Sequence, residues 1–121
     1  MTESILQTAK KLITGLTPED TTFNDDIIIH TNTALNILSQ LGAGDPSFQI
    51  TGADETWSDF TTDAYLNLCK SYVALKVRLL FDISTLTGPI ISAYEKQLSE
   101  LEWRINAVSD PIEDNKLKLL S

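Results

Sequence analysis

The feature that most constrains the fold is a helical repeat of buried-type residues that runs without a break from residue 24 to residue 41. Its members lie on one helical face, at spacings of three or four positions apart from the adjacent Ala34 and Leu35: Ile27, Thr31, Ala34, Leu35, Leu38 and Leu41. Asn24 is suited to the N-terminal cap, Asp25 and Asp26 suit the positive end of the helix dipole, and Gly42 ends the pattern. Strands have a period of two and are shorter, so this stretch predicts a long helix.

The same criterion predicts three further helices. Residues 4–14 form a short amphipathic segment, and residues 58–81 are apolar on two faces, which is typical of a central helix enclosed by its neighbours. Residues 89–108 carry the seam of a helix packed lengthwise on another. We therefore expect an all-α fold, a small helical bundle of about four helices in one domain over residues 1–108, followed by a partner-docking tail over residues 109–121.

Residues 42–57 do not fit a helix. Four residues interrupt any helical pattern: Gly42, Gly44, Pro46 and Gly52. Phe48 and Ile50 alternate with polar residues, which leaves either a long loop or a short β-arm over residues 47–51 between the second and third helices. Long loops in small domains are usually functional, so we expect Phe48, Ile50 and Trp57 to contact another subunit.

Composition excludes several classes of function. The chain has 121 residues, of which 42% are hydrophobic and 21% charged, as in globular domains. Nine Lys and Arg against seventeen Asp and Glu give a net charge of −8, which argues against nucleic-acid binding through a broad basic surface. No apolar run approaches the roughly 20 residues that span a bilayer, and no signal peptide is visible, so we expect no membrane association.

Few residues could carry catalysis. His30 is the only histidine, which excludes a two-histidine zinc motif, and Cys69 is the only cysteine. Both fall inside expected helices, so we interpret them as structural residues rather than as a nucleophile and its base. The Gly42-Ala43-Gly44 run is too short for a phosphate-binding loop. We therefore predict no catalytic residues and no cofactor.

Carboxylates gather before and at the start of the third expected helix: Asp54, Glu55, Asp59 and Asp63. A two-metal nuclease would need convergent acids of this kind. Acids at a helix N-terminus also simply complement the helix dipole, and we prefer that interpretation. No metal site is predicted.

Trp103 and the C-terminal residues are the best candidates for contacts with partners. Trp103 falls outside the apolar seam, on the side of Ser92, Lys96 and Ser99. It is either covered by the loop around Phe48 or exposed for a partner subunit, and in a ring one subunit's loop could cover its neighbour's tryptophan. The tail ends in a run typical of a partner-binding peptide: Lys116, Leu117, Lys118, Leu119 and Leu120.

Five stretches of the chain, in this order, match a familiar pattern. They are FNDDIIIHTN at residues 23–32, LSQLGAG at 38–44, TWSDF at 56–60, YVALKVRLLFD at 72–82 and ELEWRIN at 100–106. They resemble the head–tail connector (adaptor) proteins of long-tailed bacteriophages and prophages, and the resemblance covers about residues 5–108.

The resemblance implies a helical virion protein without enzymatic activity, assembled in the host cytoplasm, whose copies form a ring of twelve beneath the capsid portal. Its partners would be further copies of itself, the portal protein, and the next connector or the tail-terminator protein, with DNA passing through without specific binding. In such a ring, Phe48, Ile50, Trp57 and Trp103 would lie at the subunit interface and residues 116–120 would contact the portal.

Two other functions remain open from the residues. One is an intracellular helical bundle that regulates another protein, which would explain the helices but not the ordered set of matching stretches. The other is an acidic DNA mimic, which needs carboxylates spaced like phosphates on one face, whereas here nine cations are interspersed among the acids. An enzyme is the least supported class.

Overall fold

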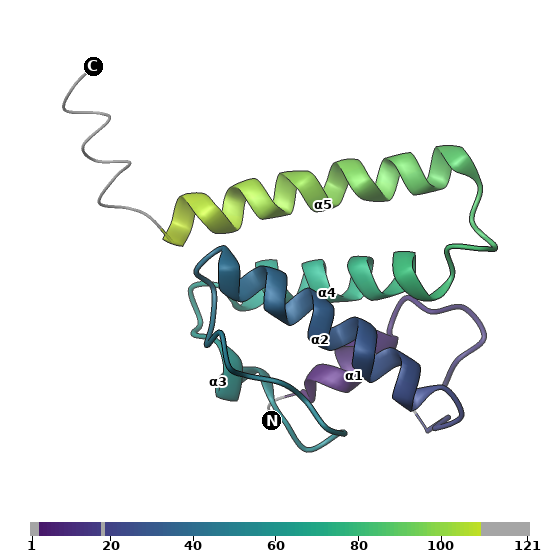
Figure 1. Ribbon diagram of the computed structural model, residues 1–121, viewed down its shortest axis with the longest axis horizontal. Coiled ribbons are helices and arrows are strands. Elements are labelled where there is room, and N and C mark those ends of the chain that lie inside the picture. Colours follow the sequence, from purple (N-terminus) through teal and green to yellow (C-terminus); the bar gives the residue numbers. More distant parts are fainter. Residues whose placement is uncertain (1–2, 18, 110–121) are drawn as a thin grey trace.

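The computed structural model describes residues 3–17 and 19–109, arranged as Figure 1 shows. Within these residues the chain forms five helices: α1 (Ile5–Lys10), α2 (Asn24–Gln40), α3 (Trp57–Phe60), α4 (Leu66–Phe81) and α5 (Gly88–Ser109). The only β-structure described is an isolated antiparallel bridge between Ser4 and Thr56. The prediction of an all-α bundle is confirmed, and residues 47–51 form no strand, so the connection between α2 and α3 is a loop.

The first helix is shorter than the sequence predicts. The Ser4 hydroxyl caps it by accepting a hydrogen bond of 3.1 Å from the Gln7 amide, but the helix ends at Lys10 instead of residue 14. Beyond it, Arg78 of α4 donates to the Leu12 carbonyl oxygen at 2.9 Å and to the Thr14 hydroxyl at 2.6 Å. Because the Leu12 carbonyl oxygen and the Thr14 hydroxyl accept hydrogen bonds from α4, the chain after Lys10 is held by a tertiary contact and does not continue the helix.

The second helix has the length that its repeat predicts, but the expected cap is wrong, because Phe23 and not Asn24 holds the cap position and no side chain caps the helix. It begins at Asn24, carries Asp25 and Asp26 in its first turn, and is followed by Gly42 at a φ of +96°, where glycine is favoured. The predicted stripe forms its buried face, with Ile27, Thr31, Ala34, Leu35 and Leu38 all buried. Phe23, just before the helix, packs edge-on against the Phe81 ring at the end of α4, with centroids 5.4 Å apart.

The single helix expected over residues 58–81 is wrong, because the structure divides it into α3 and α4. Thr56 and Asp59 form a capping box that starts α3, in which the Thr56 amide donates to Asp59 Oδ2 at 3.0 Å. Thr61 is then extended, at φ −143° and ψ 177°, and its hydroxyl donates to the Ala43 carbonyl oxygen at 2.5 Å. A contact with the distant loop therefore ends α3 where local periodicity would continue.

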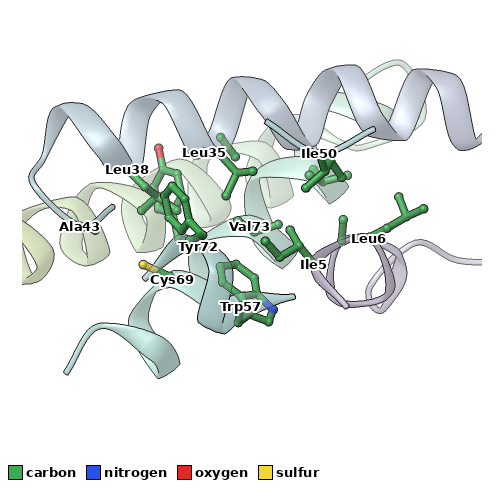
Figure 2. Packing of buried hydrophobic residues seen from close by; sticks show 14 of the residues in the cluster. Ile5, Leu6, Leu35, Leu38, Ala43, Ile50, Trp57, Cys69, Tyr72 and Val73 are labelled. Atoms are coloured by element: carbon green, nitrogen blue, oxygen red, sulfur yellow. The ribbon is translucent and has the colours of Figure 1, made fainter. Parts of the chain in front are cut away.

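The fourth helix is the central element, as predicted. It packs against α1, α2 and α5, and six of its residues are buried: Cys69, Tyr72, Val73, Ala74, Val77 and Leu79. Figure 2 shows Leu35 and Leu38 of α2 above Tyr72 and Val73 of α4, with Trp57 below them. The core therefore lies between α4 and the N-terminal half of the chain.

The fifth helix forms the remaining layer and lies along α4 (Figure 1). Pro89 is in its first turn, and Leu98 and Ile105 of the predicted seam are buried. The buried Tyr72 of α4 donates its hydroxyl proton to Glu102 Oε2 at 2.7 Å. Burial, together with the Glu102 carboxylate, raises the pKa of Tyr72, so the phenol stays protonated and keeps this link between the two helices.

Candidate functional site

Cys69 and His30, which the sequence analysis considered as a nucleophile and its base, lie in different surroundings. Cys69 is fully buried in the core, and this burial raises the pKa of its thiol to about 12. The thiol is therefore protonated at neutral pH and shielded from any substrate. His30 lies on α2 with its side chain partly buried.

Two of the four acidic residues near α3, Glu55 and Asp59, have structural partners. Glu55 Oε2 accepts hydrogen bonds from the Thr51 amide at 3.0 Å and the Thr51 hydroxyl at 2.9 Å. Slight burial acts to raise the pKa of Glu55, but hydrogen bonds from Thr51 and Gly52 outweigh it and the pKa is lowered. Asp59 belongs to the capping box of α3. Among residues 3–17 and 19–109, no group of three or more His, Cys, Asp and Glu side chains is placed to hold a metal ion.

The loop between α2 and α3 is anchored in its own subunit, which corrects part of the predicted interface. Ile50 is 2% exposed and Trp57 is fully buried. The Trp57 indole N–H donates to the Thr8 hydroxyl of α1 at 2.8 Å, and the Ile5 amide donates to the Glu55 carbonyl oxygen at 3.1 Å. Because their side chains complete the core of the subunit, Ile50 and Trp57 are not accessible to a neighbour.

Phe48 is more exposed than the buried Ile50 and Trp57. Its ring packs on that of Phe60, with centroids 5.4 Å apart, and its side chain remains partly exposed. Of the three loop residues expected at an interface, only Phe48 therefore keeps accessible surface.

Asn32, which sequence reasoning missed, holds the loop in place. Its side-chain amide donates to the Ile50 carbonyl oxygen at 3.0 Å, and its Oδ1 accepts from the Ile50 amide at 2.8 Å. Both backbone polar groups of a buried residue are thus satisfied by one side chain, as a neighbouring strand would satisfy them. An asparagine within a helix gives no sequence signal of such a contact eighteen residues away.

Replacing Asn32 by alanine should loosen this loop. The Asn32→Ala variant leaves two buried polar groups of Ile50 without their partners, each worth about 1–3 kcal/mol when unsatisfied. Amide hydrogen exchange should show loss of protection over residues 48–57, and urea unfolding should show a lower free energy of unfolding. Asn36→Ala, on an exposed position one turn further along α2, is the matched control and should change neither quantity. Unchanged protection at Ile50 in Asn32→Ala would contradict the assigned role.

Trp103 is the most exposed large hydrophobic side chain among the residues that the structure describes. It is 71% exposed, so the loop around Phe48 of its own subunit does not cover it. This result decides between the two sequence interpretations for the single chain. Trp103 lies opposite Leu98 and Ile105 of α5, which are buried against the rest of the molecule, and shares its side of the helix with Ser99 and Lys96, both exposed.

A second exposed apolar residue, Ile29, was not singled out from the sequence. It is 62% exposed on the side of α2 opposite the buried stripe. Beside it lies an open groove between α2 and the following loop, lined by Ile29, Asn32, Thr33, Asn36, Pro46, Phe48 and Gln49. We call this the α2 groove. Ile29 had no clear signal in the sequence, because it is the third of three consecutive isoleucines and helical periodicity assigns only Ile27 to the buried face.

Comparison with known proteins identifies the family. A family described as phage connector protein matches residues 5–111 of this chain. The chain belongs to this family. No curated protein and no solved structure matches it significantly.

The family assignment gives the general role of the chain. Phage connectors are structural proteins of the virion that act at the junction of head and tail and interact there with other phage proteins. No helix among the described residues is long and apolar enough to cross a membrane. The proposed portal-contact residues 116–120 lie outside the described residues.

Proposed function

We propose that copies of this connector form a ring, with twelve as the implied number, between the capsid portal and the tail. The ring would extend the DNA channel and offer a docking surface to the next connector or to the tail-terminator protein. One observation carries the proposal: a chain of the connector family presents Trp103 71% exposed on the outward face of α5. Large aromatic side chains exposed on a domain surface are the usual anchors of protein interfaces.

The charge of the chain suits a channel wall. Each copy carries a net charge of −8, and a ring multiplies this charge around its axis. A wall of the same sign as the phosphate backbone repels DNA, so the genome passes without being held.

Residues 116–120 are proposed as the contact with the portal. Three leucines within five residues supply a short apolar sequence of the kind that docks into a groove on a partner, and two lysines accompany them.

The proposed function is tested in the phage that encodes the chain. Deleting its gene should give DNA-filled heads without attached tails in electron micrographs, and supplying the full chain from a plasmid should restore tailed particles. Supplying a chain that lacks residues 112–121 should not restore them, although its circular dichroism spectrum stays that of the full chain. Tailed, infectious particles in the absence of the chain would refute the proposal.

Trp103→Ala separates assembly from folding. Because the side chain is 71% exposed, its removal should change the free energy of unfolding by no more than about 0.5 kcal/mol. The variant should nevertheless fail to restore tailed particles. Ile83→Ala, which truncates another half-exposed apolar side chain between α4 and α5, is the matched control and should restore them. Full restoration by Trp103→Ala would show that α5 makes no essential contact through this residue.

A further inference from the structure

The two most exposed large apolar side chains of the described residues are Trp103, at 71%, and Ile29, at 62%. They belong to different helices, α5 and α2, each of which packs against α4 through its opposite face (Figure 1). Their outward faces therefore point away from the molecule in different directions, and one chain cannot bring them together. A second copy of the chain can.

We infer that the outward face of α5 in one copy packs on the α2 groove of the next copy, with Trp103 as the anchor. This inference rests on the proposed ring and names the two surfaces that join its subunits. A contact between two different surfaces of the same chain is a head-to-tail contact, and such contacts close into rings when the rotation from copy to copy allows it.

The chemistry of the two surfaces is complementary. All seven residues that line the α2 groove are uncharged, although the chain as a whole is strongly acidic. On the outward side of α5, Lys96, Ser99 and Asn106 lie around the tryptophan, and Glu100, three residues before it, is paired with Arg104 at 2.7 Å. An aromatic anchor on an uncharged, partly apolar surface with a polar surround is the usual composition of an interface centre.

Charge and spacing set the register. Lys96 precedes Trp103 by seven residues, and Asp26 precedes Thr33 of the groove by the same number, so each pair lies on one helix face about 10 Å apart. With the two helices parallel, Lys96 faces Asp26 and its neighbour Asp25 while Trp103 lies over Thr33 beside Phe48. All three charged residues are exposed in the single chain.

If the two helices were antiparallel, Lys96 would not face Asp25 and Asp26. This orientation would place Lys96 near Gln40, seven residues after Thr33 and uncharged, so the charges favour the parallel arrangement. Between copies that each carry a charge of −8, a local contact of opposite sign also directs the encounter to this surface.

Mixing two variants tests the head-to-tail contact. Trp103→Ala removes the anchor and Ile29→Asp places a charge in the groove, and both positions are exposed, so both variants should keep the thermal stability of the parent chain. In sedimentation velocity the parent chain should associate increasingly with concentration, whereas each variant alone should stay monomeric. An equimolar mixture should form a dimer and nothing larger, because it retains a single intact pair of surfaces.

A charge exchange tests the register. Lys96→Glu and Asp26→Lys should each weaken association about tenfold or more, and a chain with both substitutions should associate as the parent does. Glu95→Lys, also exposed and next to Lys96 but toward another side of α5, is the control and should have little effect.

Three outcomes would overturn the inference: a parent chain that stays monomeric at every concentration, a mixture of the two variants that stays monomeric, or a double charge exchange that fails to restore association. If gene deletion gives tailless heads while any of these occurs, the connector function stands and Trp103 contacts another partner, such as the portal. If deletion leaves tailed particles but the mixture dimerises, the contact stands and the connector function fails.

Discussion

Trp57→Ala should lower the free energy of unfolding by about 3–5 kcal/mol, one of the largest effects expected of a single substitution in this chain. Trp57 is fully buried, packs edge-on against Phe60, and donates its indole N–H to the Thr8 hydroxyl at 2.8 Å. Its removal leaves a cavity where α1, α3 and the loop after α2 meet, and takes away the donor to the Thr8 hydroxyl, which keeps Glu3 and the Ser4 carbonyl oxygen as acceptors. Urea denaturation followed by circular dichroism measures the loss.

The other tryptophan provides the control. Trp103→Ala removes a side chain of the same size from an exposed position and should leave the free energy of unfolding within about 0.5 kcal/mol of the parent. Trp57→Phe keeps a buried ring but not the hydrogen bond, so its loss should lie between the two. Equal losses for Trp57→Ala and Trp103→Ala would contradict the burial that distinguishes them.

Gly44→Ala should destabilise the chain by about 1–3 kcal/mol, through crowding instead of a cavity. A Cβ at this position would lie 2.7 Å from the Phe60 carbonyl oxygen and 2.5 Å and 2.6 Å from two atoms of the Phe60 ring. The ring cannot move aside freely, since Phe48 and Trp57 pack on it. The expected result is a lower melting temperature in a thermal unfolding experiment.

Gly52→Ala is the matched control in the same loop. A Cβ there would have no heavy atom within 4 Å, and Gly52 does not need a positive φ. Because alanine restricts the unfolded chain more than glycine does, this variant should be as stable as the parent or gain up to about 1 kcal/mol. A Gly44→Ala variant as stable as Gly52→Ala would show that the loop does not lie closely against Phe60.

These variants together address the role of residues 42–57. The sequence suggested a protruding loop that contacts a neighbour, whereas the structure ties the loop to its own subunit through Ile50, Trp57 and Thr61. Its residues Pro46 and Phe48 form one wall of the α2 groove, the surface proposed to receive α5 of the next copy. The loop thus shapes a surface on α2 instead of reaching across to another subunit.

The sequence by itself determined the parts of this protein that depend on a repeated local pattern. The stripe from Ile27 to Leu41 predicted α2, and the two apolar faces of residues 58–81 predicted a central helix, which α4 is. Many residues contribute to each of these patterns, so single exceptions such as Ile29 did not alter the result. The ordered stretches likewise predicted the connector family, which the family match confirmed.

Only the tertiary structure decided where the irregular segments lie. The end of α3 depends on one hydrogen bond from Thr61 to Ala43, the end of α1 on Arg78 of α4, and the inward position of Ile50 on Asn32. Each is a single contact between residues far apart in the chain, and none leaves a periodic signal. The exposure of Trp103 has the same origin, because whether a side chain outside a seam is covered depends on where a distant loop folds.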